Sequence, residues 1–249
     1  MPPSLRAHGD PPVYFTFESL RREGVAHVTT TRHCPGVTSP SEQMGPFNAQ
    51  ARETLAAAGL DLSRVAYARQ VHGADVARAT GGFAGDADVL TTTERAVPLA
   101  IFTADCLAII AWDGEANVLS VAHVGWRGTV KRAQQAAVTA LHRLGAEPGR
   151  LRVAIAPAIG PCCYEVDEPV IGEFTRAFGG ERVARWSRPS RAGHVMLDLW
   201  RANEDLLVDA GVGPARIDNP RLCTACHPEL LYSYRKGNRG RLVTVAALP

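Results

Sequence analysis

The sequence has very little lysine and no long uninterrupted apolar run. Only Lys131 and Lys236 are lysines, against 25 arginines, and because alanine and glycine are also abundant we interpret this excess as coding bias. The net charge of +2 gives no general attraction to nucleic acid or to an anionic membrane. The most apolar stretch, residues 99–112, contains Thr103 and Asp105 and is too short to span a bilayer. We therefore expect neither nucleic acid nor a membrane as a partner.

Several sequence motifs for cofactors are also absent. Neither a Gly-x-Gly-x-x-Gly segment nor a Walker loop occurs, and no His-x-His pair provides the paired-histidine copper ligands of a multicopper oxidase. Residues 1–12 lack the apolar segment of a signal peptide, so we expect a cytoplasmic protein whose cysteines stay reduced. Six cysteines in 249 residues are too few for a disulfide scaffold but enough for a metal or thiol site.

The order of apolar segments and turn signals predicts a single mixed α/β domain. Residues 1–12 carry four prolines and predict a flexible lead-in, and residues 34–45, rich in Pro, Gly and Ser, predict a loop. Apolar and β-branched runs predict strands at 13–17, 25–31, 65–71, 87–91, 99–103, 107–112, 118–124, 151–156, 230–234 and 242–247. Capping residues and apolar periodicity predict helices at 48–59, 129–144, 169–178 and 199–210. No linker or repeat divides the chain, which indicates one domain over residues 13–249.

Three segments place side chains that bind metals just after apolar strands. They are RQVHGADV with His72, FTADCLAII with Cys106, and VAHVGWRGTV with His123. One thiolate and two imidazoles suit zinc, or copper, and three protein ligands leave a fourth position for water or substrate, as in catalytic zinc sites. The spacing is long-range and matches no local motif. The alternative to a metal site is that Cys106 is an ordinary buried cysteine and that the two histidines only form hydrogen bonds.

The segment HVGWRGT is a candidate anion site. Gly125 and Gly128 allow tight turns on either side of Arg127, and a helix is expected to begin nearby, so phosphate could be held there. The alternative is an Arg127 that stacks on Trp126. Arg32, between a strand and a loop, is a second candidate phosphate ligand, and its alternative is an ordinary surface arginine.

Two further cysteine pairs lie in the second half of the chain. Cys162 and Cys163 are adjacent, and neighbouring cysteines rarely bridge each other because the geometry strains the intervening peptide. The segment CTACH at 223–227 matches a haem-attachment signature, but no export signal accompanies it. A structural zinc on Cys223 and Cys226 needs two more ligands that the sequence does not identify. We therefore expect structural or weakly reactive thiols.

Six motifs together resemble a known family. RQVHGADV, FTADCLAIIAWD, VAHVGWRGTV, IGPCCYEV, LDLWRAN and CTACHPELLYSYRKGNRGR occur in the order typical of the YfiH-like laccase-domain family. Its members are called polyphenol oxidases, multifunctional purine nucleoside phosphorylases or peptidoglycan editing factors. The resemblance implies an α+β fold with four α/β/β/α layers and mixed β-sheets in a single domain. It also implies a metal bound by His72, Cys106 and His123.

The resemblance is weaker in the amino-terminal region. The family usually has a Gly-Gly-Val-Ser loop and an Asn-Leu-Gly stretch, and here these read HCPGVTS and FNAQ. The His-Val-Gly-Asp segment that often follows is missing. Substrate contacts made by that loop in the family are therefore not carried over to this chain.

The resemblance implies a zinc-dependent purine nucleoside phosphorylase that also deaminates adenosine and acts on methylthioadenosine. The candidate catalytic residues are Asp105, Cys106 and Arg127, with Asp105 moving protons, binding ribose or orienting a metal ligand. Arg127, Arg32 and Gln70 are the candidate ligands of substrate and phosphate. The alternatives are a copper-dependent, laccase-like polyphenol oxidase and a peptidoglycan-precursor editing factor. We expect a nucleoside and phosphate as small-molecule partners, and a monomer or homodimer.

Overall fold

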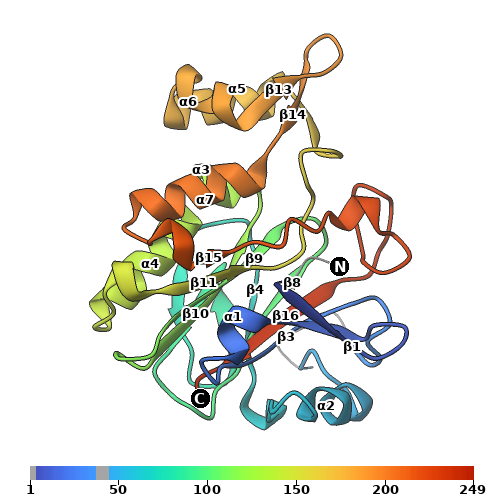
Figure 1. Ribbon diagram of the computed structural model, residues 1–249, viewed down its shortest axis with the longest axis vertical. Helices are drawn as coiled ribbons and strands as arrows, with labels where there is room; N and C mark the ends of the chain where they lie inside the picture. The colour runs from blue at the N-terminus through green and yellow to red at the C-terminus, as the bar shows by residue number, and fades with distance from the viewer. Residues whose placement is uncertain (1–3, 38–44) are drawn as a thin grey trace.

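Two β-sheets pack face to face, and helices cover both outer surfaces, in the computed structural model, which describes residues 4–37 and 45–249 (Figure 1). The predicted four-layer α/β/β/α arrangement with mixed sheets in a single domain is confirmed. Residues 1–3, within the predicted lead-in, and residues 38–44, within the predicted loop, lie outside the described residues.

The seven-stranded sheet has the order β1-β2-β3-β16-β8-β4-β6. Its strands, in that order, are Leu5–His8, Tyr14–Phe17, Ala26–Thr30, Leu242–Ala247, Leu99–Thr103, Ala66–Arg69 and Gly82–Asp86. The sheet is mixed because β4 runs parallel to β6 and β8, while the other pairs are antiparallel.

The six-stranded sheet has the order β15-β11-β9-β10-β7-β5. Its strands are Ile217–Asp218, Arg152–Ile155, Leu107–Asp113, Val118–Val124, Val89–Thr92 and Val76–Arg78. This sheet is also mixed, because β11–β15 and β5–β7 are parallel pairs. A small third sheet has the order β12-β14-β13, with strands Glu165–Asp167, His194–Leu197 and Ser187–Pro189.

The helices lie mainly outside the two large sheets. The α-helices are α1 Glu18–Arg21, α2 Ala49–Ala56, α3 Trp126–Val130, α4 Ala133–Arg143, α5 Glu168–Phe178, α6 Gly180–Trp186 and α7 Leu199–Asp209. Short 3₁₀ helices are η1 Leu62–Arg64, η2 Pro148–Arg150, η3 Pro214–Arg216 and η4 Thr224–Cys226. Among the described residues, no helix combines the length and apolar character that crossing a bilayer requires.

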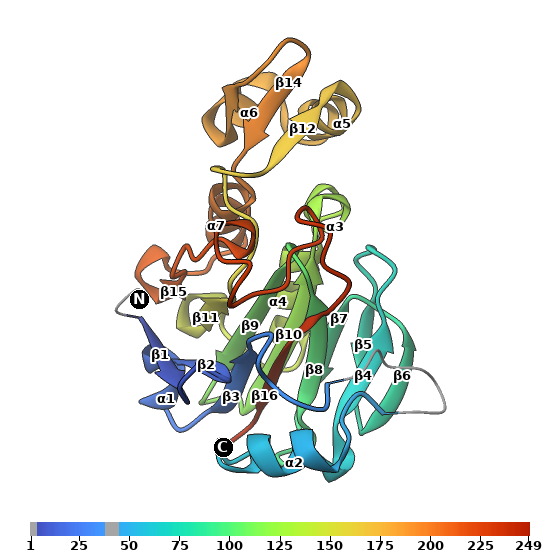
Figure 2. The same cartoon turned by 90° about the vertical axis from the view of Figure 1, so that its right-hand side faces the viewer.

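The central strands bury both of their faces, as their near-continuous apolar sequences predict. Successive side chains of a strand point to opposite faces. On β8, Leu99 and Ile101 therefore enter the core between the sheets, whereas Ala100 and Phe102 enter the core beneath α2. The outer face of the six-stranded sheet is covered by α4, and α7 packs against α4 and α3, between the strands and the helices α5 and α6 (Figure 2).

The structure differs from the predictions at both ends of the chain. Residues 5–8 form β1, paired with β2, where a flexible lead-in was expected, because Leu5 is buried in the core between the sheets. Residues 230–234 do not form the expected strand. Their backbone closes local turns onto His227, and the apolar signal comes from Leu231, which is buried from within a turn.

The expected helix at 129–144 begins earlier and is broken. It starts at Trp126, and Arg132 adopts a left-handed φ of 65° that separates α3 from α4. The strands of the small sheet escaped prediction because all three are short and β12 and β13 contain few apolar residues. With α5 and α6 they form the projection at the top of Figure 1.

We expect Val121→Ala to lower the free energy of unfolding by about 2 kcal/mol, because Val121 is fully buried between the sheets and its loss leaves a cavity. The same substitution at Val208, which is 38% exposed on α7, should change it by less than about 0.5 kcal/mol. Urea unfolding followed by circular dichroism measures both. Equal losses in the two variants would contradict the inter-sheet position of Val121.

Candidate functional site

The structure brings His72, Cys106 and His123 together. His72 follows β4, Cys106 lies in the turn between β8 and β9, and His123 lies near the end of β10. Their ligand atoms all lie within 4.8 Å of one another, and the two imidazole rings meet edge to face with centroids 4.8 Å apart. His123 is buried, whereas His72 is exposed to solvent. The three side chains can therefore converge on one ion that remains accessible from outside.

A buried carboxylate, Asp88, organises this cluster. It accepts a hydrogen bond from Nδ1 of His123 at 2.7 Å, and backbone N–H groups of Val71, His72 and Gly73 donate to it at 2.6–3.1 Å. A carboxylate can only accept here, so His123 carries its proton on Nδ1 and leaves Nε2 free as a ligand. Burial raises the pKa of Asp88, but the hydrogen bonds from His123 and from the backbone outweigh burial and lower it.

Asp88 escaped prediction from the sequence. The only signal was a charged residue in GDADVL, inside a run expected to be an apolar strand. Such a residue needs buried partners, but nothing local indicates that those partners are a histidine of β10 and the loop that carries His72.

The ionisation of the cluster follows from its mutual contacts. Burial raises the pKa of the Cys106 thiol, but hydrogen bonds with His123 and His72 outweigh burial and bring it to about 7. Burial lowers the pKa of His123, but its hydrogen bonds with Asp88 and Cys106 raise it to about 9. Near neutral pH the Cys106 thiolate therefore forms beside a protonated His123, and a metal ion that binds Nε2 displaces that proton. Such a pair offers a sulfur ligand already deprotonated for a metal ion.

The backbone around the cluster is unusual. His72 has φ 56° and Asp105 has φ 86°, both in the left-handed region that costs residues other than glycine about 1–3 kcal/mol. Hydrogen bonds to Asp88 hold the first of these turns. At Gly125, a Cβ atom would lie 2.8 Å from Sγ of Cys106 and 3.4 Å from Cδ2 of His72. Only glycine leaves enough room for these two ligands at this position.

The cluster lies on the wall of a cavity of about 980 Å³. Several of the residues that line it carry cationic or aromatic side chains: Arg69, Arg127, Arg235, Arg241, Phe83, Phe102, Trp126, Tyr164 and Tyr234. Aromatic faces suit a planar base, and arginines suit an anion such as phosphate. The cavity therefore offers metal-binding, anion-binding and stacking groups together.

Arginines and rings are paired around this cavity. The guanidinium of Arg127 lies 4.3 Å from the ring centre of Trp126, so the stacking foreseen as an alternative for Arg127 is present. Arg127 nevertheless lines the cavity. Arg235 lies 5.4 Å from the ring centre of Tyr164, and burial raises the pKa of that tyrosine. Both arginines are thus held by an aromatic face at the cavity wall.

Asp105 and Gln70 also line the cavity, but their polar atoms are engaged within the protein. The carboxylate of Asp105 accepts from the hydroxyl of Thr224 at 2.6 Å and from the backbone N–H of Arg235 at 2.7 Å. The amide of Gln70 exchanges hydrogen bonds with the backbone N–H and C=O of Phe102 at 2.8 and 2.7 Å. Both residues therefore hold cavity walls in position.

Arg32 is not among the residues that line the cavity. Its guanidinium is 5.3 Å from the ring centre of Tyr232 and donates to the carbonyl oxygen of Pro228. The fold therefore brings Arg127, but not Arg32, to the cavity that the His72–Cys106–His123 cluster lines. The sequence patterns did not identify Tyr164, Arg235 and Arg241 as lining residues. Each lies in a segment without regular structure, and nothing in such a segment indicates which cavity its side chains reach.

Comparisons with known proteins identify the family of the chain. Residues 18–249 match the family model described as multi-copper polyphenol oxidoreductase laccase. A purine nucleoside phosphorylase of Deinococcus radiodurans is 40% identical over 205 residues, which cover 81% of this chain and 77% of that protein. Adenosine deaminase RL5, from an unknown prokaryotic organism, is 33% identical over 208 residues, covering 78% of this chain and 79% of that protein.

Solved structures show the same fold. The hypothetical protein YfiH of Bacillus licheniformis superimposes with a TM-score of 0.87 and 26% identity, covering 99% of this chain and 100% of that one. YlmD from Geobacillus stearothermophilus gives a TM-score of 0.85 and 28% identity, covering 97% and 98%. The chain therefore belongs to the multi-copper polyphenol oxidoreductase laccase family, the YfiH-like laccase-domain family that its motifs resemble.

Proposed function

We propose that this protein is a zinc-dependent purine nucleoside phosphorylase that also deaminates adenosine and phosphorolyses methylthioadenosine. Relatives named purine nucleoside phosphorylase and adenosine deaminase support an enzyme of this kind. The observation that carries the proposal is that one cavity joins the His72–Cys106–His123 cluster to arginines and aromatic rings. Phosphorolysis needs an anion site beside a nucleoside site, and this cavity offers groups for both.

The metal site has the donor set that zinc prefers. His72, Cys106 and His123 supply two nitrogens and one sulfur, Asp88 leaves Nε2 of His123 free, and Gly125 keeps space beside the sulfur. A zinc ion bound there supplies a Lewis acid that activates a water molecule or polarises a substrate oxygen.

The anion is held by arginine. We assign Arg127 as the main phosphate ligand, because it lines the cavity on the helix that follows Gly125. Arg235 and Arg241 line the same cavity and add positive charge. These side chains orient phosphate for attack at the ribose C1′, with adenine as the leaving group. Arg32 takes no part in this assignment, since its guanidinium lies against Tyr232.

The purine is held by the aromatic walls of the cavity. Phe83, Phe102 and Tyr164 offer ring faces or edges on which a planar base can pack. Asp105 contributes by fixing Arg235 and the segment of Thr224, both of which donate to its carboxylate. Its part in the reaction is therefore that of a positioning residue, with proton transfer as the alternative.

Copper-dependent phenol oxidation is the second candidate. The matching family model is named for a multi-copper oxidase, and two imidazoles and a thiolate also bind copper. Within residues 4–37 and 45–249, the metal-competent clusters are this mixed one and an all-cysteine one. A single copper held by two histidines and a cysteine lacks the paired-histidine cluster with which multicopper oxidases reduce dioxygen. We therefore rank oxidation second.

The reaction is tested by incubating zinc-loaded protein with adenosine, with and without phosphate, and separating the products by chromatography. We expect phosphate-dependent release of adenine and phosphate-independent formation of inosine. Release of none of adenine, inosine and hypoxanthine by the metal-replete protein would rule the proposal out. High phenol turnover at one copper per chain, without nucleoside activity, would reverse the order of the two candidates.

Arg127→Gln should raise the KM for phosphate by about tenfold or more, because it removes one charged hydrogen-bonding partner of the anion. Arg143→Gln is the matched control, since Arg143 is exposed at the end of α4 and does not line the cavity. Initial rates of adenine release at varied phosphate measure both. An unchanged KM for phosphate in Arg127→Gln would remove this residue from the anion site.

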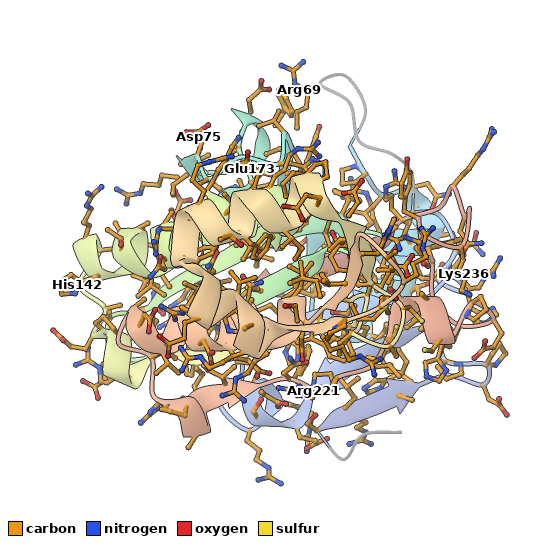
Figure 3. All side chains as sticks on the ribbon, turned by 90° about the horizontal axis from the view of Figure 1, so that it is seen from above. Arg69, Asp75, His142, Glu173, Arg221 and Lys236 are labelled. Carbon is orange, nitrogen blue, oxygen red and sulfur yellow. The ribbon has the colours of Figure 1, made fainter. Side chains whose placement is uncertain are left out.

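Asp88→Asn should weaken zinc binding by about 10–100-fold, because an amide cannot accept all four hydrogen bonds made by the carboxylate. Asp75→Asn is the control: this nearby carboxylate is exposed and projects from the surface (Figure 3). Competition with a chromophoric chelator gives the dissociation constants. If the two variants bind zinc equally well, Asp88 does not orient the ligands.

A further inference from the structure

A second cluster of four cysteines lies outside the His72–Cys106–His123 cluster. Sγ of Cys226 is 3.4 Å from Sγ of Cys162 and 3.5 Å from Sγ of Cys163, and with Cys223 all four sulfurs lie within 4.8 Å of one another. All four are free cysteines. The two cysteine pairs of the sequence thus supply each other with the two ligands that each pair lacks.

The fold builds this cluster from two distant segments. Ala158 and Cys223 form a parallel bridge, and Thr224 N–H donates to the Ala158 carbonyl at 3.1 Å. The N–H of Gly160 donates to Sγ of Cys223 at 3.2 Å. The turn at 160–163 and the 3₁₀ helix η4 then place their cysteines side by side. Backbone contacts on both sides therefore hold the sulfurs together.

The spacing of the sulfurs suits one tetrahedral ion. Zinc–sulfur bonds of about 2.3 Å separate the sulfurs of a tetrahedral site by about 3.8 Å. The observed 3.4 and 3.5 Å lie near this value and well beyond the length of a disulfide, which is about 2.05 Å. An iron–sulfur cluster spaces its cysteine ligands more widely than a single ion does. Four thiolates without a histidine or an open position are typical of structural zinc.

We propose that Cys162, Cys163, Cys223 and Cys226 bind a structural zinc ion, separate from the ion proposed at His72, Cys106 and His123. Cys162 and Cys226 are exposed, so the ion can enter from solvent.

This zinc site holds two walls of the cavity in position. Tyr164 follows Cys163 directly and lines the cavity. Thr224, between Cys223 and Cys226, donates its hydroxyl to Asp105, the neighbour of Cys106. The zinc therefore fixes Tyr164, which is the next residue after Cys163. It also fixes Thr224, the next residue after Cys223 and the hydrogen-bond donor to Asp105. It orders the cavity without touching a substrate.

The test measures zinc per chain by mass spectrometry of protein purified with a thiol reductant. We expect wild type to hold two zinc ions, His72→Ala to keep one, and the double variant His72→Ala/Cys226→Ser to keep none. Cys34→Ser removes a cysteine that belongs to neither cluster, and it should retain both ions. We also expect Cys226→Ser to unfold at a lower temperature than Cys34→Ser.

A second measurement needs no change to the cysteines. X-ray absorption at the zinc edge of His72→Ala should show only sulfur neighbours, at about 2.3 Å. A folded His72→Ala protein without zinc, a disulfide within the cluster, bound iron with sulfide, or nitrogen and oxygen neighbours would each overturn the proposal. Metal content does not depend on nucleoside turnover, so this outcome is separate from that of the proposed function.

Discussion

The carboxylate of Asp88 connects the two sheets' contributions to the candidate site. It lies directly before β7, accepts the Nδ1 proton of His123 on β10, and binds the backbone of the loop after β4 that carries His72. Asp88 is fully buried, so its charged carboxylate has lost the water molecules that would solvate it, and these N–H donors take their place. Without this carboxylate, the left-handed backbone at His72 would lose the hydrogen bond that holds it, and His123 would have no defined tautomer. Ligand geometry therefore depends on one buried charge that is not itself a ligand.

The packing of the two sheets explains why the site forms at this place. Strands β8, β9 and β10 are buried on both faces, and most of their polar side chains lie at or near a strand end, as Thr103, Asp113 and His123 do. Polar residues gather where these strands end or turn, and this is where Cys106 and Asp105 lie and where the following helix places Arg127. The constraint also explains Gly125, because the chain must pass close to the sulfur of Cys106. The same strands thus form the apolar core along their length and carry the polar candidate site at their ends.

The two cysteine-containing clusters are mechanically connected. Asp105 accepts hydrogen bonds from Thr224, inside the second cysteine pair, and from the backbone of Arg235 at the cavity wall. The structural ion proposed at the cysteine cluster therefore restrains residues that line the cavity. The proposed division, with one accessible cluster for chemistry and one all-cysteine cluster for structure, matches the general distinction between open and closed zinc sites.

Sequence patterns alone determined the buried strands, the four layers through the family resemblance, and the three ligand types of the first cluster. Each buried strand has its own apolar pattern and each ligand type lies in its own short segment, whereas the four layers were expected from the family that the motifs resemble. Only the tertiary structure decided that Asp88 binds His123, that Arg32 lies away from the cavity, and that Cys162 and Cys226 are neighbours. Such contacts join segments tens of residues apart, and they depend on how the sheets stack and where loops cross. No short segment of the sequence predicts these contacts, because they form only when the complete chain packs.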